Sequence, residues 1–153
     1  MIKAIIFDYN KTMYLPDLKE IPTETFELLK RLRYSGIILG LISSRAPKRR
    51  EQFEKFCLYT YFDFIKIVDK KKISDFRASL KYFKVKKSEM LVVGDRLEEE
   101  IKLANILGIK SVWIRHGKMK SIKEIERPTW VINSVLEIEN LFLKANQKIY
   151  IQN

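Results

Sequence analysis

The chain has 153 residues, of which 46% are hydrophobic, and its formal net charge at pH 7 is +11. This length suits one domain with a substantial core, and the composition excludes a disordered chain. No apolar run approaches the ~20 residues of a membrane span, and the N-terminus lacks a signal-peptide pattern. We therefore expect a soluble, cytoplasmic protein with no membrane partner. The single cysteine, Cys57, excludes a disulfide framework.

Short apolar runs alternate with stretches of helical periodicity along the chain. The apolar runs predict strands over residues 2–7, 37–43, 64–68, 90–94 and 110–114, with an edge strand over 130–132. The periodic stretches predict helices over residues 23–34, 47–56, 73–83, 97–107 and 135–144. Such alternation favours right-handed crossovers and a parallel sheet with helices on both faces. The predicted fold is a three-layer, Rossmann-like α/β domain spanning residues 1–153.

Residues able to bind a phosphate and a metal follow the predicted strands, where ligands of parallel sheets bind. Asp8 ends the first strand, and a carboxylate can attack phosphorus or ligate Mg²⁺. Thr12 supplies a hydroxyl in the same loop. Ser43 ends the second strand, and its hydroxyl and the following backbone N–H groups can hold phosphate oxygens, with Ser44 as a further phosphate-binding candidate.

The loops after the third and fourth strands supply a lysine and further acids. A lysine from residues 70–72 can neutralise charge on a transferring phosphoryl group. Asp95 follows Gly94 and is a candidate metal ligand, with Glu100 close to the metal. We interpret Glu98 and Glu99 as acids that stabilise the N-terminus of the next helix.

These four loops, in this order, resemble the haloacid dehalogenase superfamily, whose members are mostly phosphatases. Residues 8–12, Asp-Tyr-Asn-Lys-Thr, resemble its Asp-x-Asp-x-Thr motif, and residues 38–43 resemble its second motif. Lys70 best suits the spacing of the third motif, although Lys71 and Lys72 stay open as alternatives. Gly94-Asp95 with Glu100 resembles the fourth. The resemblance implies Mg²⁺ held by Asp8, the Asn10 backbone carbonyl, Asp95 and Glu100, with an aspartyl-phosphate formed at Asp8.

The chain departs from the family pattern in two ways. Asn10 stands where the family has the acid that protonates the leaving group and then activates water, and an amide can do neither. General acid–base catalysis contributes roughly 10²–10⁴-fold, so we expect slow turnover. The gaps between the first three motifs are also too short for an inserted cap domain, so we expect an open site unless an oligomer partner covers it.

Cations gather at the predicted strand ends around the site, and they favour anionic partners. Capless members of the superfamily often act on phosphate within large molecules. We therefore consider a polyanionic or macromolecular phosphorylated substrate, with nucleic acid as one candidate. The candidate rim residues are Lys11, Arg45, Arg49, Arg96 and His116.

The first hypothesis is thus a Mg²⁺-dependent phosphomonoester phosphatase with Asp8, Asn10, Ser43 and Lys70 at its catalytic centre. The alternative is a non-catalytic module of the same fold that binds phosphate or nucleic acid. A phospho-receiver domain is disfavoured, because receivers are phosphorylated on the third strand and carry an acid pair after the first.

Overall fold

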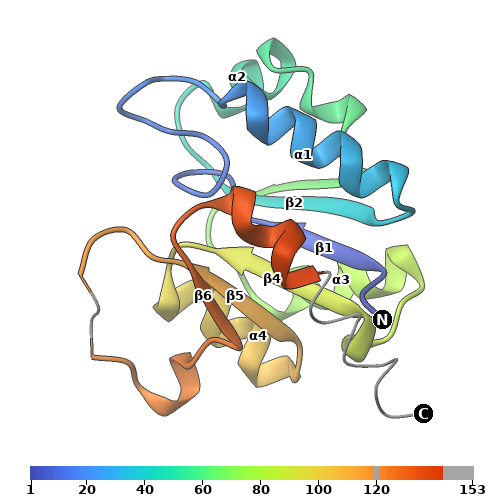
Figure 1. Ribbon diagram of the computed structural model, residues 1–153, viewed down its shortest axis with the longest axis vertical. Helices are drawn as coiled ribbons and strands as arrows, with labels where there is room; N and C mark the ends of the chain where they lie inside the picture. The colour runs from blue at the N-terminus through green and yellow to red at the C-terminus, as the bar shows by residue number, and fades with distance from the viewer. Residues whose placement is uncertain (119–120, 143–153) are drawn as a thin grey trace.

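The computed structural model describes residues 1–118 and 121–142. Six parallel strands form one sheet in the order β3-β2-β1-β4-β5-β6 (Figure 1). The strands are β1 (Ala4–Phe7), β2 (Ile38–Ser44), β3 (Phe64–Val68), β4 (Met90–Gly94), β5 (Lys110–Ile114) and β6 (Trp130–Ile132). The α-helices are α1 (Thr23–Tyr34), α2 (Arg49–Lys55), α3 (Ile73–Phe83) and α4 (Lys102–Leu107). A π-helical stretch, η3 (Leu97–Ile101), precedes α4, and short 3₁₀ turns are η1 (Leu58–Thr60), η2 (Lys87–Glu89), η4 (Glu124–Glu126) and η5 (Val135–Glu137).

The predicted parallel α/β fold is confirmed, although β1 begins two residues later than predicted, β2 lies one residue further along the chain, and three helices differ. The helix predicted from residue 47 begins at Arg49, because Lys48 adopts a left-handed conformation with φ 59°. The helix predicted over 97–107 begins with the π-helical stretch η3. The predicted helix 135–144 consists of η5 followed by helical residues 138–142, and residues 143–144 lie outside the described residues.

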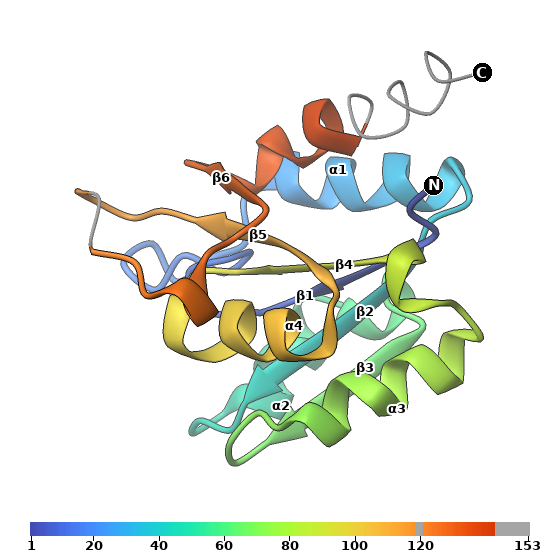
Figure 2. The same ribbon diagram turned by 90° about the horizontal axis from the view of Figure 1, so that it is seen from below.

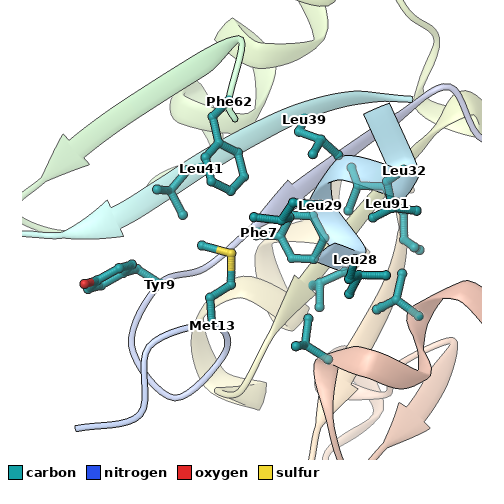
Figure 3. Close-up of a cluster of buried hydrophobic side chains, with 14 of the residues drawn as sticks. Phe7, Tyr9, Met13, Leu28, Leu29, Leu32, Leu39, Leu41, Phe62 and Leu91 are labelled. Carbon is teal, nitrogen blue, oxygen red and sulfur yellow. The ribbon is translucent and has the colours of Figure 1, made fainter. Parts of the chain in front are cut away.

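The strand side chains alternate between two apolar clusters, one on each face of the sheet. Ile5 and Phe7 belong to the same cluster as Leu28 and Leu29 of α1 and Phe53 of α2. Figure 3 shows Phe7 beside Leu28 and Leu29. The other face carries Ala4, Ile6 and Val92, which pack against α3 and α4 through residues such as Phe76 and Leu107. Figure 2 shows α1 on one face of the sheet and α3 and α4 on the other. Burial on both faces explains the continuous apolar strands.

The strand order places the candidate residues at one edge of the sheet. From β1 the chain adds β2 and β3 on one side of the sheet, and then β4, β5 and β6 on the other side. In parallel sheets ligands bind beyond the carboxyl ends of the strands at such a topological switch point, which here lies between β1 and β4. In Figure 1 the loops after β1 and β5 lie on the same side of the sheet. The segment between β1 and β2 contains α1, and the segment between β2 and β3 contains α2 and η1. None of the described helices is long and apolar enough to span a membrane.

Candidate active site

A tightly folded loop positions Asp8 at the carboxyl end of β1. The Asp8 N–H donates to the Val93 carbonyl at 2.9 Å, which continues the pairing of β1 with β4. Tyr9 follows and is fully buried, and its carbonyl accepts hydrogen bonds from the N–H groups of residues 12, 13 and 14. Figure 3 shows the Tyr9 and Met13 side chains beyond the end of β1, beside the apolar cluster. The loop is therefore anchored in the core while Asp8 faces the site.

Three carboxylates from separate loops converge at this point. Asp8, Asp95 and Glu100 each offer an oxygen, and these oxygens lie within 4.8 Å of one another. Asp8 and Glu100 are buried, and Asp95 is half-buried. Burial raises the pKa of Asp95 to about 7, and the neighbouring charge of Asp8 adds to this shift. The same two causes raise the pKa of Glu100 to about 8. Carboxylates held so close together favour a divalent cation.

Lys71 lies among these acids. Its ammonium group donates hydrogen bonds to Asp8 Oδ1 and Glu100 Oε1, and the residue is only 3% exposed. Burial alone would lower the pKa of Lys71, but the two carboxylates outweigh it and the pKa is raised. Lys71 is therefore a charged lysine fixed against the proposed nucleophile.

This placement favours Lys71 over Lys70, the residue that the spacing of the sequence favoured. Lys70 is exposed in the turn after β3, whereas the next residue turns inward. The start of α3 fixes this geometry, because the Lys72 N–H donates to Asp75 Oδ2 at 2.8 Å. Asp75 is itself buried and pairs with Lys66 at 2.6 Å. Three adjacent lysines look alike in the sequence, and only the path of the chain separates them.

A cavity of about 330 Å³ opens above the acidic cluster. Asp8, Asn10, Ser43 and Ser44 all line it, as do the cluster residues Lys71, Asp95 and Glu100. Thr12 was predicted to bind phosphate but does not line the cavity. Its buried hydroxyl lies 3.4 Å from Asp8 Oδ2 as a hydrogen-bond donor, so it orients the carboxylate instead.

The loop after β4 brings a second glutamate to the cavity, which the sequence interpretation missed. Glu99 accepts a hydrogen bond from Ser44 Oγ at 3.4 Å and pairs with Arg96 at 2.9 Å. In a regular α-helix the side chains of consecutive residues point about 100° apart. The sequence therefore favoured only one of Glu99 and Glu100 as facing the cavity. The wide turn of η3 brings both Glu99 and Glu100 to the cavity.

Gly94 is required by the same close packing. A Cβ atom at this position would lie 2.7 Å from Glu100 Oε2 and 2.9 Å from its Cγ. Any larger residue would displace Glu100 from the cluster. The close approach of the Glu100 side chain thus explains why a glycine precedes Asp95 in this chain.

The predicted rim residues do not all line the same cavity. Lys11, Arg49 and Arg96 line the main cavity. His116 lines a neighbouring cavity of about 290 Å³, and its Nε2 lies 2.6 Å from the Lys11 carbonyl oxygen. Arg45 does not line the main cavity and pairs instead with Asp69 at 2.9 Å. Arg96 pairs with Glu98 as well as Glu99, so its charge is already balanced.

The fold is that of a parallel α/β protein with three carboxylates and a buried lysine gathered at the carboxyl ends of its strands. Residues 1–114 match the sequence model of the haloacid dehalogenase-like hydrolases, and the chain belongs to this family.

Curated relatives of the chain are phosphatases. The glyceraldehyde 3-phosphate phosphatase of Pyrococcus furiosus is 32% identical over 123 residues, covering 76% of this chain and 50% of the relative. The human N-acylneuraminate-9-phosphatase is 26% identical over 128 residues, covering 80% of this chain and 52% of the relative. The chain thus spans about half the length of the curated relatives it matches.

Solved structures share the fold. A protein from Listeria monocytogenes superposes with a TM-score of 0.74 at 18% identity, covering 95% of this chain and 99% of that one. A haloacid dehalogenase phosphatase from Thermococcus onnurineus superposes with a TM-score of 0.70 at 23% identity, covering 80% of this chain and 58% of that one.

Proposed function

We propose that this chain is a phosphatase that hydrolyses phosphomonoesters through an aspartyl-phosphate at Asp8. The observation that carries the proposal is the contact of Asp8 with Lys71 inside a cluster of three carboxylates. The phosphatase relatives support the same reaction class. The organisation of residues 1–153 as a single catalytic domain remains a prediction.

The residues of the cavity divide the reaction between them. An Asp8 oxygen forms a bond to phosphorus while the bond from phosphorus to the alcohol oxygen breaks, and water later cleaves the aspartyl-phosphate. Lys71 balances negative charge on the transferring group, and the Ser43 and Ser44 hydroxyls offer it hydrogen bonds. Asn10 also lines the cavity but cannot protonate the leaving alcohol, which must take its proton from water.

The acidic cluster suits a magnesium ion. Three carboxylate oxygens within 4.8 Å form a hard, oxygen-only donor set, which Mg²⁺ prefers. Asp8, Asp95 and Glu100, with the Asn10 backbone carbonyl, would hold the ion. When bound, Mg²⁺ would offset the charge of a phosphate and of the carboxylates around it.

Removing the metal should abolish phosphate release, and the need for metal should depend on pH. Chelation with EDTA is expected to stop release from a panel of phosphomonoesters, and added Mg²⁺ should restore it. The raised pKa values of Asp95 and Glu100 mean that protons compete with the metal. The Mg²⁺ concentration for half-maximal release should therefore fall as the pH rises from about 6 to about 8. Release that is unchanged in EDTA would contradict the metal assignment.

Lys71 and Lys70 should respond very differently to substitution. Lys71→Met is expected to lower phosphate release by roughly 10²-fold or more, because the charge beside Asp8 is lost. The matched variant Lys70→Met should stay within about twofold, because that side chain is exposed. Both variants are measured with Mg²⁺ present, and circular dichroism checks their folding. Equal losses in the two variants would reject the assignment of Lys71.

A non-catalytic module that binds phosphorylated ligands is the second candidate. Asn10 is the observation that favours it, because the acid expected at this position is missing. A polyanionic or nucleic-acid ligand has weaker support than the sequence indicated, because Arg45 and Arg96 pair with acids of the chain itself. Binding of phosphate analogues without phosphate release from any substrate would favour this candidate over the enzyme.

A further inference from the structure

Arg49 is held in a fixed position beside the main cavity. Its guanidinium carbon lies 4.6 Å from the centre of the buried Tyr9 ring. Nε donates to the Ser44 carbonyl and Nη1 donates to Gln52 Oε1, both at 3.3 Å. The Tyr9 hydroxyl donates to the same Gln52 oxygen at 3.2 Å. An arginine ordered in this way loses little further freedom when it binds an anion.

The positive charge of this guanidinium is not paired with an acid of the chain. Across residues 1–118 and 121–142, Arg49 contacts the Ser44 carbonyl, the Gln52 side chain and the Tyr9 hydroxyl, and no carboxylate forms an ion pair with it. Arginine presents its N–H groups as a planar fork that matches carboxylate and phosphate oxygens. Because no carboxylate neutralises it, Arg49 can bind an anion as its first oppositely charged partner.

Arg49 also joins the main cavity to a second, basic cavity. It lines the 330 Å³ cavity that contains Asp8 and a separate cavity of about 230 Å³. The second cavity is also lined by Arg45, Lys48 and Arg50 and by one acid, Glu51. Arg45 pairs with Asp69, so the unbalanced cations are Arg49 with Lys48 and Arg50. Within the described part of the chain, the side chains of Lys48 and Arg50 have no hydrogen-bond or ion-pair partner. This cavity thus carries an excess of positive charge next to the phosphate site.

The excess charge is confined to one side of the site. The cavity on the other side, of about 290 Å³, is lined by the cations Lys11 and Arg96, the acids Asp95 and Glu98, and His116. Its two cations are matched by two acids, and Arg96 pairs with Glu98 at 2.9 Å. A charge restricted to one small cavity fits a single anionic group better than a long polyanion. About 230 Å³ is also several times the ~30 Å³ that one water molecule occupies in the liquid.

We propose that this second cavity binds another anionic group of the substrate. This inference rests on the proposed function and names its substrate class, which is small phosphomonoesters whose alcohol carries a carboxylate or a second phosphate. The transferred phosphate sits between Asp8 and Lys71, and the second anion lies against Arg49, with Lys48 and Arg50 adding charge. Arg49 is thereby a specificity-determining residue.

Non-hydrolysable ligands test the proposal without turnover. Calorimetric titrations with excess Mg²⁺ at about 0.15 M salt, where long-range charge effects are screened, would compare propylphosphonate with two relatives. One relative is 3-phosphonopropionate, which adds a carboxylate, and the other is propane-1,3-bisphosphonate, which adds a second phosphonate. At least one should bind about tenfold more tightly than propylphosphonate, and the better of the two shows which anion the cavity prefers.

Variants assign the effect to the second cavity. The affinity of the better relative divided by that of propylphosphonate should fall from about ten to about two or less in Arg49→Met. In the exposed double variant Lys48→Met/Arg50→Met, which leaves the Tyr9 contact intact, the same affinity ratio should fall from about ten to about three. Lys55→Met, at the far end of α2, is the matched control and should leave the ratio unchanged. Equal affinity for all three ligands in the unaltered protein would overturn this inference alone. Failure to bind any of them would overturn the proposed function as well.

Discussion

Replacing Asp8 with asparagine is expected to lower phosphate release by about 10³-fold or more. An amide is a far weaker nucleophile than a carboxylate, so no aspartyl-phosphate can form. The substitution also removes one oxygen of the three-carboxylate cluster and the hydrogen-bonded partner of Lys71. Phosphate release is measured with Mg²⁺ in excess, so that a weaker metal site does not account for the loss.

Asp17→Asn is the matched control for this experiment. It makes the same chemical change on an exposed acid of the loop between β1 and α1, and should stay within about twofold of the unaltered protein. Mass spectrometry after rapid acid quenching should detect a phosphate adduct on Asp8 in the control and none in Asp8→Asn. Full activity in Asp8→Asn would remove Asp8 as the nucleophile.

The fold could be predicted because its strands and helices follow local patterns. Six of the predicted segments, residues 23–34, 64–68, 73–83, 90–94, 110–114 and 130–132, agree with the observed bounds. The differences arise where the backbone leaves regular geometry. Lys48 has a positive φ and delays α2, and η3 takes a wider turn than a 3.6-residue period describes. Neither feature has a distinctive residue such as glycine or proline at the critical position.

The candidate site could be predicted as a set of loops but not as a set of contacts. Asp8, Asp95 and Glu100 end or follow predicted strands, so their convergence followed from the parallel sheet. The choice among the lysines at 70–72 depended on how the chain enters α3, which residue spacing does not specify. Glu99 was missed for a similar reason, because its direction depends on the π-helical turn.

Asn10 is the residue on which the rate of this site should depend. Asn10→Asp is expected to raise phosphate release by roughly 10²–10⁴-fold, because a carboxyl group in the cavity can protonate the leaving alcohol and then activate water. Steady-state phosphate release measures the gain. The quenched mass spectrum should change in parallel, because the aspartyl-phosphate that accumulates with Asn10 would be cleaved quickly with an acid there.

Asn10→Ala separates the acid from the loss of the amide. It keeps the backbone carbonyl that would contact the metal but adds no titratable group, so it should stay within a few-fold of the slow unaltered protein. Faster phosphate release in Asn10→Asp but not in Asn10→Ala would show that the proton-transfer group is the one part of a phosphatase site that this protein lacks. If Asn10→Asp is no faster than Asn10→Ala, the asparagine is not the limiting defect, and a binding role for the cavity around Asp8 and Lys71 becomes the better explanation.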